Sequence, residues 1–351
     1  MRILVVGQGL AGTLASHAAL DRGWDCHVLD SGQPSASAVA AGMYNPMSFR
    51  RIVEVWDAAS HLAFMKQTYT ALESLLQENL LHPLPILKRI PNAGYAQEWN
   101  RKTESLPWIE PVQTDADILQ RFPDAPPSAG YGYGIVQGGG WLNLPRLIAA
   151  WRTHLTEQGR ITHAQWHRAD VEDTLQAGWD AVIDCRGTAA AHDPTGHIDI
   201  RANRGEILTL QRPPVTVREP LPADHILNFG KWTLPVAPGQ WRLGASYEWN
   251  RKDLDPTQET ADFLLDALHT VAPDSTQLDL VRHDVGLRPV SRDRRPAVGP
   301  WPHQPGLFVF NGLGTRGVLI GPRWAECLCD IVAGKAQPPD TVDPVRLISD
   351  L

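Results

Sequence analysis

The first twelve residues constrain the fold more than any other part of the chain. Residues 2–6 form a short β-branched and aliphatic run, which predicts a strand, and they lead directly into the pattern Gly7-x-Gly9-x-x-Gly12. Residues 10–22 then predict a helix that ends at Gly23. In such a turn the first glycine permits a tight bend, the second lets a phosphate approach the backbone, and the third lets the helix pack on the strand. The chain is therefore expected to begin with a parallel βαβ unit.

The second predicted strand ends at an acidic residue. Asp30 closes residues 26–30 and lies 18 residues after Gly12. A carboxylate at this place is positioned to accept hydrogen bonds from ribose hydroxyls, and it repels a 2′-phosphate, which disfavours NADP. The strand, the glycine turn, the helix and the acid together predict a bound dinucleotide whose phosphates meet the positive end of the helix. The alternative is a glycine turn that serves packing alone, and the motif does not distinguish FAD from NAD.

The length of 351 residues suggests about two domains. The order of the predicted helices and strands along the chain predicts that the two domains are interleaved. We expect an α/β fold in which a Rossmann-like dinucleotide-binding domain is interleaved with an antiparallel-sheet plus helix substrate domain. The first domain is expected at 1–50, 138–204 and 285–351, and the second at 51–137 and 205–284. Further helices are expected near 56–82, 145–159, 256–271 and 318–332, and strands near 179–187, 206–210, 232–236, 240–247 and 306–310. Residues 83–139 are rich in proline and glycine and are expected to be irregular.

Composition excludes several classes of protein. The formal charge of −7 gives no general attraction to nucleic acid, so nucleic acid is not an expected partner. No apolar run approaches the roughly 20 residues of a membrane span, and we expect a cytoplasmic protein without a cleaved signal. The four cysteines form no C-x-x-C pair and are expected to be reduced. His163 and His167 lack a third ligand at metal spacing, so no metal is expected.

Three further stretches resemble the D-amino-acid oxidase-like flavoprotein family, which includes glycine oxidase, sarcosine oxidase and D-amino-acid dehydrogenases. Residues 40–43 resemble the family's loop beside the flavin ring, residues 285–299 its G-x-R-P segment and the strand after it, and residues 306–322 its C-terminal glycine loop and helix. Weaker matches occur at 139–146, 185–187 and 204–206. The resemblance implies FAD as the cofactor. It also implies non-covalent binding, because residues 285–290 lack the cysteine through which sarcosine oxidases tether their flavin.

The resemblance assigns cofactor contacts along the chain. Val171 is expected to meet the adenine through its backbone in a short strand, although an edge-strand valine is an equal alternative. The complete set of expected cofactor-binding residues is Gly7, Gly9, Gly12, Asp30, Ala41, Gly42, Met43, Val171, Gly187, Gly314, Arg316, Gly317 and Val318.

Two arginines are the leading candidates for the chemistry. The resemblance implies that Arg288 binds a substrate carboxylate, which its guanidinium fork suits. Arg316, with the N–H groups of Gly314, Gly317 and Val318, is expected to face the N1/C2=O edge of the flavin. The alternatives are an ion-paired surface arginine for Arg288 and a solvent-facing arginine for Arg316.

Four other residues are secondary candidates. Trp232 stands where several relatives carry a substrate-contacting tyrosine, and it is expected to form an aromatic wall or to be a core residue. Asn45 is expected near the substrate. Arg50 and Arg51 follow it and are expected either to reach an anionic substrate tail or to be solvated.

These features predict an FAD-dependent enzyme that oxidises the C–N bond of a small amino acid or secondary amine to an imine by hydride transfer to flavin N5. The alternative partner is tRNA, because residues 311–317 look closer to the FAD domain of the bifunctional enzyme that matures wobble-uridine side chains, which also removes a carboxymethyl group from a secondary amine. A non-catalytic flavin-binding protein is a third possibility. The amine, the electron acceptor (oxygen or a quinone) and the oligomeric state are left open.

Overall fold

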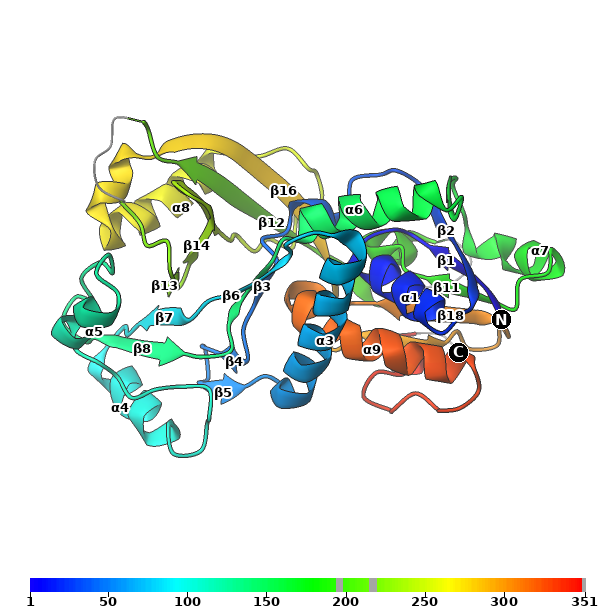
Figure 1. The fold of residues 1–351 in the computed structure, drawn as a ribbon, viewed down its shortest axis with the longest axis horizontal. Helices are drawn as coiled ribbons and strands as arrows, with labels where there is room; N and C mark the ends of the chain where they lie inside the picture. Colours follow the sequence, from blue (N-terminus) through cyan, green and yellow to red (C-terminus); the bar gives the residue numbers. More distant parts are fainter. Residues whose placement is uncertain (194–197, 215–219, 349–351) are drawn as a thin grey trace.

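The computed structural model describes residues 1–193, 198–214 and 220–348, and its strands form two main sheets (Figure 1). The first sheet has six strands in the order β10-β2-β1-β11-β18-β17. All its neighbouring strands are parallel except the edge pair of β17 and β18. Its members are β1 (Arg2–Val6), β2 (Asp25–Asp30), β10 (Ile161–His163), β11 (Ala181–Asp184), β17 (Ala297–Pro300) and β18 (Leu307–Asn311).

Both faces of this parallel sheet are buried, which explains the uninterrupted apolar run of β1. Ile3 and Val5 belong to one hydrophobic cluster, and Leu4 and Val6 belong to another. The first cluster takes in α1 (Leu10–Asp21), α3 (Ala58–Leu76), α6 (Leu144–Glu157) and α9 (Gly317–Val332), and the second takes in α7 (Val171–Gln176). Helices and strands alternate along the chain here, as expected for a Rossmann-like unit.

The second sheet has seven strands in the order β16-β12-β15-β14-β13-β7-β8, and it is antiparallel except where β13 meets β7. One face carries a hydrophobic cluster that includes residues of the loop after β2, and the other face is covered by α5 (Asp115–Arg121) and α8 (Gln258–Val271). Its members are β7 (Ile86–Arg89), β8 (Tyr133–Val136), β12 (Ile200–Gln211), β13 (Ile226–Asn228), β14 (Trp232–Ala237), β15 (Gln240–Gly244) and β16 (Asp279–Ser291).

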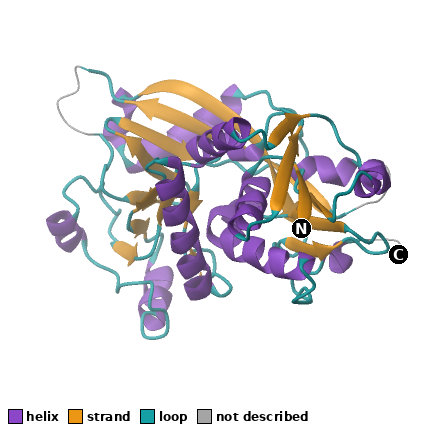
Figure 2. Cartoon of the chain, turned by 45° about the vertical axis from the view of Figure 1, so that its right-hand side comes forward, coloured by secondary structure: helices purple, strands orange, loops and turns teal. Residues whose placement is uncertain are grey.

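The long strands β12 and β16 connect the two halves of the molecule (Figures 1 and 2). They pair along 200–211 and 279–291, with one register shift between Thr209 and Leu210. The fold is therefore the expected mixture of a parallel and an antiparallel sheet. The predicted boundaries at 204 and 285 fall inside these continuous strands, and the division into domains stays a prediction.

Smaller elements complete the chain. They are α2 (Ala36–Val39), α4 (Ala93–Lys102), β3 (Met43–Tyr44), β4 (Met47–Ser48), β5 (Val53–Glu54), β6 (Leu81–Pro83) and β9 (Gly140–Leu142). In the described ranges, no helix has both the length and the apolar character that a membrane crossing needs.

Three sequence predictions about local structure are wrong. Residues 83–139 are not irregular, since they contain β7, α4, α5 and β8; the start of α5 carries a capping box of Thr114 and Asp117 that could have revealed it. The helix expected at 56–82 ends at Leu76, because Gln77 adopts a left-handed conformation with φ 54°. Val171 begins α7 instead of lying in a strand.

Candidate cofactor and substrate site

A cavity of about 720 Å³ is lined by residues from both sheets. This volume lies within the range of roughly 300–1,000 Å³ that is usual for small-molecule sites. Part of the lining comes from the turn at 6–11, the end of β2 and the loop at 33–49. The rest comes from β12, β14, β16, residues of the loop after β15, the loop after β11 and the start of α9.

The glycine turn forms part of the cavity wall. Gly7 has φ 95°, which favours glycine, and its N–H donates to the Leu29 carbonyl at 2.7 Å. A Cβ on Gly12 would overlap the carbonyl oxygen of Gly7, so Gly12 allows α1 to pack closely on the turn. A helix leaves its first N–H groups without intrahelical partners. Gly9, the N-cap of α1, lines the cavity together with Leu10 and Ala11, and the Leu10 N–H donates to Oγ of Ser37 at 3.0 Å. This arrangement fits a dinucleotide pyrophosphate.

Asp30 lines the same cavity as an anion. Its Oδ1 accepts from the Gln8 N–H at 3.0 Å, and its Oδ2 accepts from the Gly32 N–H at 3.2 Å and from the Arg152 side chain. Burial alone would raise the pKa of Asp30, but the Arg152 hydrogen bond and the two backbone hydrogen bonds outweigh it and lower that pKa. A carboxylate has about four acceptor sites, so capacity remains for a ribose hydroxyl.

The loop at 40–43 is fixed from two sides. Gly42 has φ 73°, and a Cβ there would overlap the Leu142 carbonyl, so only glycine fits. The Ala40 carbonyl accepts from Nη1 of Arg242 on β15 at 2.8 Å, a contact that the sequence did not suggest. Ala41 and Met43 line the cavity, as do Gly187, Gly314, Gly317 and Val318.

Val171 requires a correction. The Asp170 carboxylate accepts from the His167 N–H at 2.7 Å, and this contact starts a helical turn at the point where a strand was expected. Val171 is therefore buried in the cluster behind the parallel sheet and is not among the cavity-lining residues. Gln165 and Trp166 line the cavity instead.

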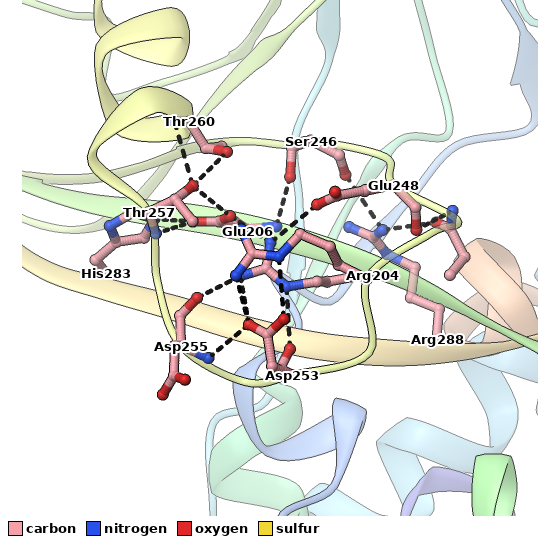
Figure 3. A network of polar contacts seen from close by, with 12 residues as sticks. Arg204, Glu206, Ser246, Glu248, Asp253, Asp255, Thr257, Thr260, His283 and Arg288 are labelled. Carbon is pink, nitrogen blue, oxygen red and sulfur yellow. Dashed lines mark hydrogen bonds and ion pairs between the residues drawn. The ribbon is translucent and has the colours of Figure 1, made fainter.

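Arg288 lines the same cavity, and Figure 3 shows its polar contacts. Its Nη1 donates to Oδ1 of Asn203 at 3.0 Å and to the Ser246 carbonyl at 3.3 Å, and its Cζ lies 4.7 Å from the centroid of the Tyr247 ring. Burial lowers the pKa of Arg288, but an arginine remains charged. Within the described ranges no carboxylate forms an ion pair with it, so its charge is available to an anionic ligand.

Two features of β12 hold Arg288 in this orientation. A Cβ on Gly205 would overlap the guanidinium, so Arg288 lies flat over the strand because residue 205 is glycine. Ser246 is fixed because its Oγ accepts from the Glu206 N–H at 2.9 Å. The sequence suggested Arg288 but neither of these supports.

A buried ion pair holds the loop after β15 against β12 (Figure 3). Arg204 and Glu206 pair with each other, and both side chains are fully buried. Nε of Arg204 donates to the Asp253 carbonyl at 3.0 Å, and Glu206 accepts from the Thr257 N–H and hydroxyl, each at 3.0 Å. Such a pair is costly unless its remaining polar atoms are satisfied, and the loop provides those partners.

Of the other predicted residues, Trp232, Asn45 and Arg316 line the cavity, whereas Arg50 and Arg51 do not. Trp232 lines the cavity as an aromatic wall, and its ring packs on Gly244. Asn45 also lines the cavity, but its Oδ1 accepts from the Met47 N–H at 2.9 Å and so stabilises its own loop. Arg316 lines the cavity from the turn before α9, where burial and the neighbouring Arg294 lower its pKa.

Arg50 and Arg51 are both exposed, and neither is among the cavity-lining residues. The Arg51 carbonyl accepts from the Lys102 ammonium at 2.7 Å, which fixes this segment to α4. The position of both side chains favours the solvated alternative.

Known proteins resemble this chain over its whole length. Glycine oxidase from Pseudomonas aeruginosa is 26% identical over 370 aligned residues, which cover 95% of each chain. The tRNA 5-methylaminomethyl-2-thiouridine biosynthesis bifunctional protein from Burkholderia lata is 25% identical over 99% of this chain, but the chain spans only 60% of that relative's length. The crystal structure of glycine oxidase from Geobacillus kaustophilus superposes with a TM-score of 0.81 at 21% identity, covering 99% of this chain and 98% of that one.

Most of the chain also matches the model of one protein family. Residues 2–331 match the family model described as FAD dependent oxidoreductase. That range includes the glycine turn, Asp30, the loop at 40–43, Arg288 and the start of α9. The chain therefore belongs to the D-amino-acid oxidase-like family of FAD-dependent oxidoreductases.

Proposed function

We propose that this enzyme oxidises the C–N bond of a small amino acid or secondary amine to an imine, which water then hydrolyses. The observation that carries the proposal is Arg288, a cation that has no acid partner among the described residues and lines the same cavity as the glycine turn. FAD, when bound, supplies the hydride acceptor at N5 and passes the electrons to oxygen or a quinone. The substrate Cα loses the hydride, and the amine nitrogen loses a proton as the C=N bond forms.

The residues of the chain have separate roles in this proposal. Arg288 binds the substrate carboxylate and so orients the Cα–H bond, which is the main requirement of hydride transfer. Trp232 forms the apolar wall that keeps water from the reacting carbon. Arg316 and the backbone N–H groups at the start of α9 stabilise negative charge at the N1/C2=O edge of the flavin.

We expect the FAD to be non-covalent. Of the four cysteines, Cys185 alone lines the cavity, and burial raises the pKa of its thiol well above the usual value, so it is not a reactive thiolate. Acid precipitation should release the yellow colour into the supernatant, measured by absorbance. Colour that stays with the protein pellet would show a covalent link.

Replacing Asn203 with aspartate should weaken substrate binding. The Asn203 amide holds Arg288 without neutralising it, whereas a carboxylate at the same place would form an ion pair with it and compete with the substrate. We expect KM for a carboxylate-bearing amine to rise about tenfold, equivalent to about 1.4 kcal/mol. Asn143→Asp is the control, because Asn143 caps α6 and aspartate is an equally good cap. An unchanged KM in the Asn203 variant would contradict this role.

The second candidate function is oxidation of a side chain in tRNA. It is favoured by the Burkholderia relative, whose similarity covers 99% of this chain. A protein that neutralises several phosphates shows affinity that falls steeply with salt, because each contact releases counterions. The chain has a net charge of −7, so we expect no retention of tRNA at physiological ionic strength and little salt dependence of turnover.

A turnover assay tests the leading proposal against this alternative. Free amino acids and secondary amines are supplied singly with an artificial acceptor that takes two electrons, and the carbonyl product is measured against the acceptor reduced. The proposal requires equal amounts of the two products with at least one free amine. Turnover with bulk tRNA alone would reverse the order of the two candidates.

A further inference from the structure

The hydrogen bonds of Arg288 use one of its two terminal nitrogens (Figure 3). A guanidinium has five N–H donors in a planar fork, and Nη1 carries two of them. Nη1 has two acceptors, Oδ1 of Asn203 and the Ser246 carbonyl. Neither Nε nor Nη2 has an acceptor among the described residues. A carboxylate that accepts two parallel hydrogen bonds is therefore expected at the Nε/Nη2 edge.

Tyr247 is the aromatic residue next to this guanidinium. The 4.7 Å between Cζ of Arg288 and the ring centroid lies within the roughly 6 Å of a cation–π contact. Both residues line the cavity. Tyr247 is 60% exposed, whereas Arg288 is half-buried, so the ring is the outer of the two groups. A carboxylate on Arg288 would thus lie beside the ring.

The backbone on both sides of Tyr247 is bonded to β12 (Figure 3). The Ser246 N–H donates to the Glu206 carbonyl at 3.3 Å, and the Glu248 N–H donates to the Arg204 carbonyl at 2.9 Å. The Arg204 N–H donates back to the Glu248 carbonyl at 2.8 Å. These bonds hold the backbone of Tyr247 on the strand, so the ring stays near the guanidinium without being buried.

The position of the ring matters for the strength of a charge pair. An ion pair in contact with water contributes little, because water and dissolved salt screen it. The same pair is stronger where an apolar group keeps water away. The phenol hydroxyl of Tyr247 forms no hydrogen bond with a described residue, so the ring, and not the hydroxyl, is the part that contacts Arg288.

We propose that Tyr247 shields the ion pair between Arg288 and the substrate carboxylate from water, and that its aromatic ring does this without its hydroxyl. Tyr247 is then a substrate-binding residue of the same site. This inference rests on the proposed function, because it takes the carboxylate to be held by Arg288.

The test uses acetate as the probe, because acetate carries the carboxylate and no amine. The holoenzyme is titrated with acetate, and binding is followed by the flavin absorbance spectrum. We expect Tyr247→Ala to raise the dissociation constant about tenfold and Tyr247→Phe to leave it within about twofold. Acetamide, which is the same size but uncharged, should bind the alanine variant and the unaltered enzyme equally.

Trp249→Ala is the matched control variant. Trp249 is also an exposed aromatic residue of the loop after β15, at 52% exposure, but it is not among the cavity-lining residues. This variant should bind acetate as the unaltered enzyme does. Because both aromatic side chains are exposed, neither alanine variant should unfold at a much lower temperature than the unaltered protein.

Salt dependence distinguishes shielding from a purely structural role. Salt screens exposed charges strongly and shielded charges much less. Between about 0.05 and about 0.5 M sodium chloride, the dissociation constant of acetate should rise at least about threefold more in Tyr247→Ala than in the unaltered enzyme or in Tyr247→Phe. A residue that only supports the loop would weaken binding equally at both salt concentrations.

The outcomes separate this inference from the proposed function. If Tyr247→Ala binds acetate like the unaltered enzyme at both salt concentrations, the inference is wrong and the proposed function stands. If Tyr247→Phe is as weak as Tyr247→Ala, the hydroxyl binds the carboxylate and shielding by the ring is wrong. If acetate binds Arg288→Leu as well as the unaltered enzyme, the carboxylate site itself is wrong. If no amine is oxidised but acetate binding depends on both residues, the proposed function fails and the inference stands.

Discussion

Replacing Arg288 with leucine should raise KM for a carboxylate-bearing amine by about 30-fold to several thousand-fold while FAD remains bound. Loss of one member of a buried charge pair costs about 2–5 kcal/mol, and this range gives the expected change. Asn203 and the Ser246 carbonyl would keep their positions but would offer the carboxylate no charge. The measurements are steady-state kinetics and the ratio of flavin to protein absorbance.

Two further variants sharpen this result. Arg288→Lys should recover little activity, because an ammonium is a point charge that lacks the guanidinium fork. Arg292→Leu is the control, because Arg292 is an exposed arginine just after β16 whose one hydrogen bond to the described residues goes to the Arg346 carbonyl. Unchanged kinetics in Arg288→Leu would move the carboxylate site to Arg316, which is another arginine that lines the cavity.

The second large effect is expected at the glycine turn. Gly12→Ala places a Cβ where the Gly7 carbonyl oxygen now lies, so α1 must move away from the turn. Overpacking of this kind typically costs about 1–3 kcal/mol, and it displaces the amides that meet the pyrophosphate. We expect a protein that retains little FAD and unfolds at a lower temperature, measured by absorbance and by thermal denaturation.

Gly94→Ala is the matched control for that variant. Gly94 is also a helical glycine, but a Cβ there would lie 3.5 Å from Oδ1 of Asn92, which is an ordinary contact. Alanine in a helix is more favourable than glycine, so this control should be as stable as the unaltered protein or more so. A Gly12→Ala variant with a full complement of FAD would contradict the role given to the turn.

The features that sequence reasoning predicted are local ones. The glycine turn, Asp30 and the cap at Asn143 depend on residues a few positions apart, and the structure has β1, α1, β2 and α6 where they were expected. Arg288 was suggested by a short family motif, and it lines the cavity. The fold class followed from the alternation of predicted helices and strands, and it is confirmed.

The features that it missed depend on strand pairing over long distances. Asn203 meets Arg288 across 85 residues because β12 and β16 pair with these two residues opposite each other, and no local pattern specifies that register. Val171 was misplaced because the turn at 168–170 depends on side-chain contacts: the His167 N–H donates to Asp170, and the Arg168 N–H donates to the distant Asp193.

The central claim is that free amines reduce the flavin of this enzyme, and anaerobic absorbance spectroscopy tests it most directly. The purified enzyme is mixed with single amino acids and secondary amines without oxygen, and the flavin band is followed with time. The account predicts that at least one carboxylate-bearing amine bleaches the band, and that the same amine bleaches it far more slowly in Arg288→Leu at the same concentration. A flavin that stays oxidised with every free amine, or that is bleached only by tRNA, would contradict it.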